Sequence, residues 1–227
     1  IRTVLERNPY YWKEGQPYID RLELIPIADP AARANALLSG DVDLIHNLTG
    51  SGIDEVKNSS VASAFVTAST YYSAIQAAVD VPPGNNTDLN LCFAHLFDRK
   101  RFLDTVLKGY GTIANDHPFG PNSQFYNKDL PQRELDLDKA KFHHGKSGIG
   151  QAKIPIVVTP GVPYSLEMGQ LMLREATRAG IPLDIKREPA EGYWTAIAGK
   201  RPHFATGFYP RPTYSMYLTL GWRKDAS

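Results

Sequence analysis

The sequence of 227 residues has few of the features that indicate disulfide bonds, membrane-spanning segments or nucleic-acid binding. It has one cysteine, Cys92, which excludes an intrachain disulfide and a metal site built from several cysteines. No run approaches the roughly 18 apolar residues that a membrane-spanning helix needs. The net charge is +1 at pH 7, and "DRKR" at 98–101 is the one dense basic cluster, so we expect no nucleic-acid partner.

The motifs of common enzyme classes are missing as well. The sequence has no G-x-S-x-G elbow, no P-loop, no G-x-G-x-x-G after a strand and no H-E-x-x-H. His143 and His144 are adjacent, and neighbours on a helix point about 100° apart, so they do not share a metal ion. Asp41 and Asp43 would share one face of a strand, but capping contacts explain them. We therefore expect no catalytic residue, metal ligand or cofactor.

What the sequence does contain is a succession of strand and helix patterns. Alternation in "IDRLELIPI" (19–27) predicts a strand. Asp29 followed by Pro30 is typical of a helix start, and Gly40 can take the left-handed conformation that ends a helix. "DVDLI" (41–45) then predicts a second strand. Together these segments predict a parallel strand–helix–strand unit with a right-handed crossover.

The rest of the chain continues this alternation, which predicts an α/β architecture with helices packed on a mixed sheet. "VPPGNN" (81–86) can continue neither a helix nor a strand, so we place a domain crossing there. The long aperiodic segment 110–135 predicts a functional or wrapping loop. The other expected strands are 61–69, 71–79, 154–159, 181–188 and 203–208, and the other expected helices are 52–57, 88–96, 98–109, 136–146, 165–180 and 191–199.

Aromatic residues gather near the ends of these predicted elements. Amphipathic rings at such places suit a cleft that grips a ligand without reacting with it. "GFYPRPTYSMY" (207–217) adds a cation between rings, and Arg211 there can bind a carboxylate bidentately. An ordinary surface position for Arg211 is an equally open alternative. The ligand-binding residues that we predict are Tyr71, Tyr72, Trp194, Tyr209 and Arg211.

Several stretches in series resemble one known family. "NPYYWKEGQPYIDRLELIPIADPAARANALLSGDVDLI" (8–45), "FAHLFDRKRFLDTVLKGYG" (93–111) and "HFATGFYPRPTYSMYLTLGW" (203–222) are similar to segments of the extracellular solute-binding proteins of family 5, the peptide/nickel/opine type. The resemblance implies a two-lobed, type II periplasmic-binding-protein-like fold that is truncated here at both ends. It implies that residues 1–80 belong to the first lobe and 81–205 to the second, with 206–227 returning toward the first.

The resemblance also implies a function. Such proteins are periplasmic, capture a small solute between two lobes and deliver it to an ABC permease in the inner membrane; an oligopeptide or a peptide-like or opine-like solute is expected. Dipeptide-type members hold the peptide amino group with an aspartate and the peptide carboxylate with an arginine before a Pro-Tyr. Here "GFYPRPTY" (207–214) has no aspartate, and "GVPYS" (161–165) has valine in place of that arginine. Two alternatives stay open: a binding domain that signals to a partner, and a hydrolase that uses Asp41 or Asp43 with a histidine.

Overall fold

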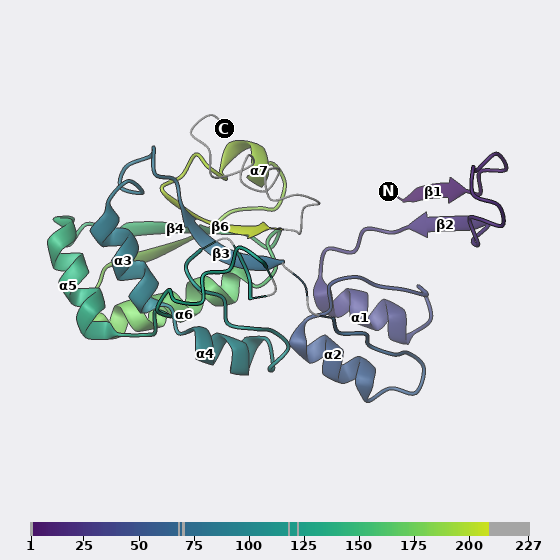
Figure 1. Cartoon of the computed structure of the whole chain (residues 1–227), viewed down its shortest axis with the longest axis horizontal. Coiled ribbons are helices and arrows are strands. Elements are labelled where there is room, and N and C mark those ends of the chain that lie inside the picture. The colour runs from purple at the N-terminus through teal and green to yellow at the C-terminus, as the bar shows by residue number, and fades with distance from the viewer. Residues whose placement is uncertain (1, 68, 70, 118, 122, 209–227) are drawn as a thin grey trace. The chain divides into compact units, whose positions relative to one another are not determined.

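The computed structural model describes residues 2–67, 69, 71–117, 119–121 and 123–208 (Figure 1). The chain divides into two compact units, residues 1–64 and 65–227, and each is described by itself below. Among the described helices, none is both long and apolar enough to cross a membrane. The lobe boundaries that the resemblance implies stay a prediction.

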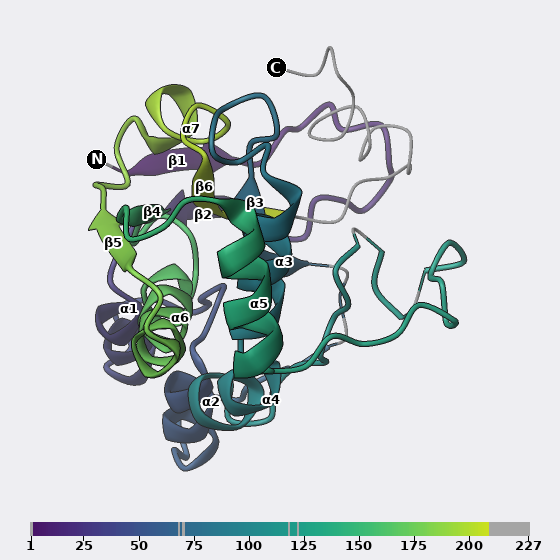
Figure 2. The ribbon, with the colours of Figure 1, turned by 90° about the vertical axis from the view of Figure 1, so that its left-hand side faces the viewer.

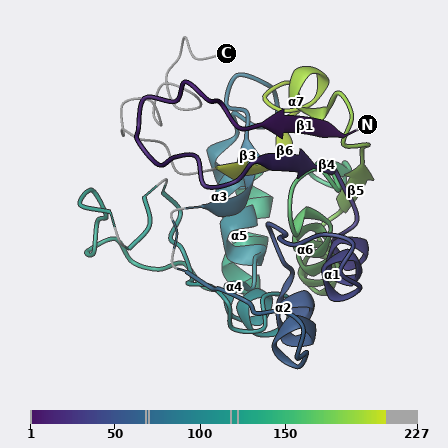
Figure 3. The same ribbon diagram turned by 90° about the vertical axis from the view of Figure 1, so that its right-hand side faces the viewer.

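The first unit is a β hairpin followed by two short helices. Strands β1 and β2 run antiparallel, with Thr3 opposite Leu24, and Figure 3 shows them side by side. The strand expected at 19–27 is confirmed in its middle, whereas its partner β1 was not predicted. The elements are β1 (Thr3–Glu6), β2 (Arg21–Leu24), α1 (Pro30–Leu38) and α2 (Gly50–Lys57).

The predicted limits of α1 are confirmed, because its two end signals act as expected. The Asp29 carboxylate accepts a hydrogen bond from the N–H of Ala32 at 2.8 Å, and Pro30 occupies the first turn, where its missing N–H costs nothing. Past the last turn, Gly40 has a φ of +81°, which an L side chain rarely adopts. These local signals place the helix without help from the rest of the chain.

The strand predicted at 41–45 is wrong, and with it the parallel strand–helix–strand unit. The N–H groups of Asp41 and Val42 both donate to the carbonyl of Ala36, at 2.9 and 3.2 Å, so the segment folds back on the end of α1. Leu44 is 83% exposed. A strand needs a neighbour for its backbone groups, and the described residues offer this segment none. The strand predicted at 61–69 is also wrong where it is described, because no strand forms there.

The second unit is built on a four-stranded mixed sheet with the order β3-β6-β4-β5 (Figure 1). β3 is antiparallel to β6, while β4 is parallel to both β5 and β6. All four strands were predicted from the sequence and are confirmed. Their bounds are Tyr72–Ala77 for β3, Ile154–Val158 for β4, Leu183–Arg187 for β5 and His203–Phe208 for β6.

The helices of this unit follow the predicted order, with two differences. Asn86, not Asp88, caps α3, since its side chain accepts from the N–H of Leu89 at 3.0 Å. The helix expected from Asp98 is confirmed only in its first turn, after which the backbone widens into a π-helix, η1. The helices are α3 (Thr87–Leu96), α4 (Arg99–Arg101), η1 (Phe102–Val106), α5 (Leu137–Ser147), α6 (Ser165–Ala179) and α7 (Tyr193–Ala196).

Helices cover both faces of the sheet. α6 packs on one face, where Gly169 lets the helix approach Val158 and Ile185 closely; a Cβ there would lie 3.0 Å from Val158 Cγ1. In Figures 1 and 2, α6 and α7 lie on opposite sides of the strands. Tyr193 of α7 is 1% exposed and donates from its hydroxyl to the carbonyl of Ala205 at 2.7 Å. The two central strands, β4 and β6, are thus buried, as parallel strands require, whereas β3 and β5 at the edges are only partly covered.

Candidate functional site

The connections of the sheet diverge at one point. From β4 the chain passes through α6 to β5 on one side, and from β5 it returns through α7 to β6 on the other side of β4. In open α/β sheets, ligands bind beyond the carboxyl ends of the strands at such a switch point. We call this region the carboxyl edge: the loops 159–164 and 188–192, the end of β6, and the start of β3, which runs the opposite way.

The loop that follows β4 is held rigidly by one hydroxyl. Ser165, 1% exposed, accepts from the N–H of Thr159 at 3.1 Å and donates to the carbonyl of the same residue at 2.5 Å. Gly161 allows the neighbouring loop to come close, since a Cβ there would lie 3.0 Å from the Cβ of Ala190. The two loops of the carboxyl edge therefore pack against each other. This contact holds their backbones in place, as a ligand-binding site requires.

A second set of contacts joins β3, β6 and the loop after β4. Ser73 donates to the carbonyl of Pro163 at 3.2 Å and lies 3.3 Å, oxygen to oxygen, from the hydroxyl of Tyr71. Gly207 lies opposite Ser73 in the ladder, and a Cβ at Gly207 would be only 2.6 Å from the Tyr71 hydroxyl. The Tyr71 ring thus lies across the backbone of β6 at the carboxyl edge, in space that only a glycine leaves open.

Tyr164 occupies the turn that leads into α6. Its φ is +62°, a left-handed conformation that costs a non-glycine residue on the order of 1 kcal/mol or more and is found often at functional sites. Its ring meets the edge of the Phe102 ring, with centroids 6.3 Å apart at 89°. Burial raises the pKa of the Tyr164 hydroxyl, with smaller contributions from Glu167 and Tyr71. The hydroxyl is therefore protonated at neutral pH and able to donate a hydrogen bond.

The structure brings the predicted ligand residues together only in part. Tyr71 lies at the carboxyl edge on the α6 face. Tyr72 follows it directly and so faces the opposite side of the sheet, because side chains alternate along a strand. Trp194 is on α7, 53% exposed, with its ring set edge-on to that of Tyr193. The other two predicted residues, Tyr209 and Arg211, lie outside the described residues.

Three residues of the carboxyl edge are not among the ligand-binding residues predicted from the sequence: Tyr164, Ser73 and Gly207. A tyrosine directly before an amphipathic helix is a weak signal, because nothing in the sequence reveals its left-handed backbone. Ser73 and Gly207 are more than 130 residues apart in the chain, and only the pairing of β3 with β6 brings them together. In contrast, Val162, at the position where the resemblance implies an arginine in dipeptide-type members, is 2% exposed and part of the core.

The carboxylates of the hydrolase alternative lie in the first unit. Asp41 accepts a hydrogen bond from the Ser39 hydroxyl at 2.8 Å, a local polar contact at the end of α1. Across the part of the chain that the structure describes, no three His, Cys, Asp or Glu side chains come together as metal ligands. The polar contact of Asp41 fits the capping interpretation of this segment.

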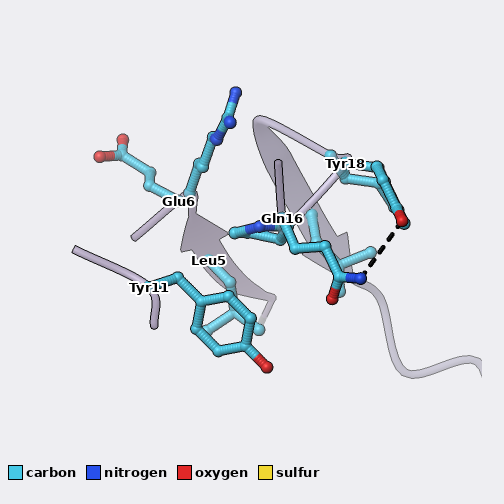
Figure 4. Close-up of a pocket in the computed structure, with 9 residues that line it drawn as sticks. Leu5, Glu6, Tyr11, Gln16 and Tyr18 are labelled. Carbon is cyan, nitrogen blue, oxygen red and sulfur yellow. Dashed lines mark hydrogen bonds between the residues drawn. The ribbon is translucent and has the colours of Figure 1, made fainter. Parts of the chain in front are cut away.

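A hollow of about 400 Å³ is formed in the first unit by the hairpin and the segment that joins its strands (Figure 4). Gln16 donates from its amide to the Tyr18 hydroxyl at 3.2 Å along its rim. The walls are open: Leu5 is 48% and Tyr18 83% exposed. Ligand pockets bury most of the surface of their ligand, and a single hairpin provides too little wall for that. We therefore place the candidate site at the carboxyl edge.

Comparison with known proteins shows the family of the chain. The family described as "Bacterial extracellular solute-binding proteins, family 5 Middle" matches residues 2–226. The chain is 24% identical over 232 residues to the nickel-binding protein NikA of Staphylococcus aureus, across 96% of this chain and 44% of the relative. It is 29% identical over 149 residues to the nickel-binding periplasmic protein of Escherichia coli, across 64% of this chain and 28% of the relative. The chain thus spans less than half the length of these relatives.

Solved structures show the same fold. The crystal structure of Staphylococcus aureus NikA in complex with Ni(L-His)2 superposes with a TM-score of 0.86 at 20% identity, over 99% of this chain and 49% of that one. The periplasmic binding protein DppA of Helicobacter pylori, in complex with the peptide STSA, gives a TM-score of 0.82 at 20% identity, over 96% of this chain and 42% of that one. The fold is therefore part of the type II periplasmic-binding-protein architecture, and the chain belongs to the bacterial extracellular solute-binding proteins of family 5.

Proposed function

We propose that this chain is part of the substrate-binding component of an ABC importer, which captures a small amino-acid-derived solute outside the cytoplasmic membrane and delivers it to the permease. The observation that carries the proposal is the match to a family of binding proteins over almost the whole chain. The carboxyl edge supports it, because a rigid loop and two tyrosine rings suit gripping more than bond-breaking.

The solute class follows from what relatives bind and from what this edge offers. Relatives bind a histidine chelate of nickel or a peptide, both built from amino acids. In this chain the turn before α6 has a buried valine, Val162, where an arginine would hold a peptide carboxylate. Hydroxyl and backbone groups of the edge must then provide the recognition. Such a site tolerates variation at the ends of a solute better than one built on ion pairs.

The mechanism is closure of two lobes around the solute, without covalent chemistry. A ligand shifts the equilibrium toward the closed state only through contacts that exist there and not in the open state. Residues of the carboxyl edge provide one set of such contacts. The other set is expected from chain that is not part of this sequence.

A thermal-shift experiment on the full-length protein tests the proposal. Short peptides, opines, sugars, and nickel with L-histidine are added separately. A ligand that binds only the folded state raises the unfolding midpoint, corresponding to about 2.7 kcal/mol at 100 times the dissociation constant. We expect a shift with a peptide or with the histidine chelate. No shift with any amino-acid-derived solute, or a shift with a sugar alone, would contradict the proposed solute class.

A single methyl group tests whether the carboxyl edge contacts the solute. Gly207→Ala places a Cβ against the Tyr71 hydroxyl, the far end of a side chain, so the ring is expected to move while the sheet stays folded. We expect about a tenfold loss of solute affinity, roughly the 1.4 kcal/mol of one good contact. Titration calorimetry on the full-length protein measures it.

The matched control keeps the new methyl group and removes the Tyr71 hydroxyl that it would meet. Tyr71→Phe in the Gly207→Ala background takes away the atom that the new Cβ would meet, and part of the lost affinity should return. If Gly207→Ala leaves affinity unchanged while Trp194→Ala abolishes it, the solute lies on the α7 face of the sheet and the proposed site is wrong.

A further inference from the structure

Phe102, at the start of η1, is buried but lies apart from the core of the second unit. It is 9% exposed, and in the described chain it does not belong to the continuous cluster of buried side chains around the sheet. Two rings contact it instead. The centroid of the Phe97 ring lies 5.5 Å away at a tilt of 52°, and that of the Tyr164 ring lies 6.3 Å away at 89°. The burial of Phe102 therefore depends on aromatic neighbours, one of which lies at the carboxyl edge.

The backbone that follows Phe102 is a π-helix. The N–H of Leu107 donates to the carbonyl of Phe102, five residues back, at 3.1 Å, and the hydroxyl of Thr105 donates to the carbonyl of Arg101 at 2.8 Å. A π-turn holds one residue more than an α-turn, so it rotates the side chains before it by about 100° relative to those after it. Single π-turns are rare and occur frequently at functional sites.

The extra residue lets the two ends of η1 face different neighbours. Phe102, at its start, meets Tyr164. Past its end the chain reverses at Gly109, which has a φ of +81°, and Gly111 packs on Leu107; a Cβ at Gly111 would lie 3.1 Å from Leu107 Cδ1. An unbroken α-helix would turn one of these two side chains away from its neighbour. The π-turn thus directs Phe102 toward the carboxyl edge while Leu107 stays against the loop.

The other ring that contacts Phe102 is held from behind by Arg99. The guanidinium carbon of Arg99 lies 6.0 Å from the centroid of the Phe97 ring. Arg99 also pairs with the carboxylate of Asp116, and it donates at 3.0 Å to a backbone carbonyl of the same aperiodic segment, 110–135. This segment therefore supports Phe97, and through it Phe102.

Tyr164 gains from such support because its side chain does not enter the core. Val162, two residues earlier, is 2% exposed, whereas Tyr164 is half-buried and its backbone is left-handed. Burial raises the pKa of its hydroxyl, in agreement with a ring held against Phe102. A side chain that contacts a ligand loses rotamer freedom on binding unless its neighbours have already fixed it.

We propose that Phe102 is a positioning residue for solute binding, which holds the Tyr164 ring at the carboxyl edge before the solute arrives. The inference rests on the proposed function, in which hydroxyl groups of this edge recognise the solute. Phe102 itself touches no solute. It lowers the entropy that Tyr164 loses on binding. Removing the Phe102 ring should therefore weaken binding only while Tyr164 is present.

Nitration of tyrosine tests the positioning in the full-length protein without solute. Tetranitromethane nitrates accessible phenol rings, and mass spectrometry of the digested protein gives the rate at each tyrosine. Phe102→Leu removes the ring but keeps an apolar side chain, so nitration of Tyr164 should become severalfold faster. The rate at Tyr10, in the first unit, should stay the same. If Phe102→Leu does not fold, Phe102→Met, which fills more of the space, takes its place.

Phe93→Leu is the matched control. Phe93 is 7% exposed, as buried as Phe102, but it packs in the core against His203. Both variants should lose stability, as large-to-small changes at buried sites do, and thermal unfolding measures that loss. Only Phe102→Leu should change the nitration of Tyr164. Equal rates in the parent and in Phe102→Leu, or the same increase in Phe93→Leu, would overturn the proposal.

Solute affinity then separates positioning from ordinary packing. Trialanine and nickel with L-histidine are titrated separately into the full-length protein. Phe102→Leu should weaken binding about fivefold, the fold-change that corresponds to one aromatic pair. In a Tyr164→Ala background the same change should leave affinity as it is. An equal loss in both backgrounds would mean that Phe102 acts independently of Tyr164, and the proposal would be wrong.

The two proposals fail separately. The nitration experiment contains no solute, so an unchanged rate at Tyr164 overturns the role of Phe102 and leaves the solute-binding function standing. If no amino-acid-derived solute binds, the proposed function fails, whereas nitration still shows whether Phe102 holds the Tyr164 ring.

Discussion

Replacing Gly84 by alanine is expected to abolish folding of the second unit or to lower its free energy of unfolding by about 3 kcal/mol or more. A Cβ at this position would lie 2.3 Å from the carbonyl oxygen of Ala78, 2.6 Å from that of Pro202 and 2.9 Å from that of Val81. All three atoms belong to the backbone, so no rotamer change relieves the contact. Chemical denaturation monitored by circular dichroism measures the loss.

Backbone hydrogen bonds hold these carbonyl groups in place. The N–H of Ala78 donates to Pro202 at 2.9 Å, and the N–H of Gly84 donates to Val81 at 2.7 Å. The segment after β3 is thus bound to the residue just before β6, and Gly84 is the point of closest approach. Moving the backbone to admit a methyl group would break these bonds and expose part of the core.

Gly145 provides the matched control, because it lies inside α5 and a Cβ there would meet nothing within 4 Å. Alanine in an exposed helix interior is favoured over glycine by about 1 kcal/mol, so Gly145→Ala should raise stability by up to that amount. Opposite signs at the two positions are the expected pattern. Equal effects would mean that the backbone around Gly84 is much looser than its contacts indicate.

A loss of stability in mild acid is the second large effect that we expect, and it arises from His203. This residue, 1% exposed, donates from Nε2 to the side-chain oxygen of Asn90 at 3.0 Å, and the amide of Asn90 in turn donates to the carbonyl of Gly84. The rings of Phe93 and His203 meet edge to face, with their centroids 4.6 Å apart. Its Nδ1 is buried and has no hydrogen-bond partner within the described structure.

Burial lowers the pKa of His203 to about 4 from an ordinary value of 6.5. Between these two values the unfolded chain binds a proton that the folded chain excludes. The part of the free energy of unfolding that depends on neutral His203 is therefore fully present above pH 6.5. It is lost progressively as the pH falls toward 4. The loss between pH 7 and pH 4.5 should be on the order of 2 kcal/mol, since one pKa unit corresponds to about 1.4 kcal/mol.

His203→Gln separates this effect from general acid denaturation. The glutamine amide can still donate to Asn90 but does not titrate, so the variant should lose much less stability between pH 7 and pH 4.5, whatever its stability at pH 7. Urea unfolding at a series of pH values gives both curves. Parallel curves for parent and variant would show that His203 is not the group responsible. Hydrogen bonds from His143, from Lys139 and from Lys186 lower the pKa values of Asp88, Asp136 and Asp184 respectively, which moves their titration away from this range.

The helices and strands of the second unit were predictable because their signals are local. Asp136 caps α5, Gly180 ends α6 in the left-handed conformation, and apolar runs such as 154–158 stand between turn residues. Each of these acts within a few residues of itself. The segment 41–45 has the same composition as a strand and still forms none, because a strand depends on a partner that lies elsewhere.

The candidate site was less predictable for the same reason. Aromatic residues near element ends led to Tyr71, which lies at the carboxyl edge, but the sequence did not show that Tyr71 and Tyr72 face opposite sides of the sheet. The approach of Gly207 to Tyr71 and the contact of Phe102 with Tyr164 join residues that are far apart in the chain. Such contacts follow from strand order and helix pairing, which composition and periodicity do not determine.

Tyr72 and Phe208 are paired at one end of the sheet. These residues are the first of β3 and the last of β6, so the chain begins and completes the whole sheet at neighbouring points, about 5 Å apart as in any antiparallel pair. A stretch with such adjacent ends behaves as an insertion. Removing it leaves a gap that one or two residues would bridge, so we expect that residues 72–208 can be excised as one unit.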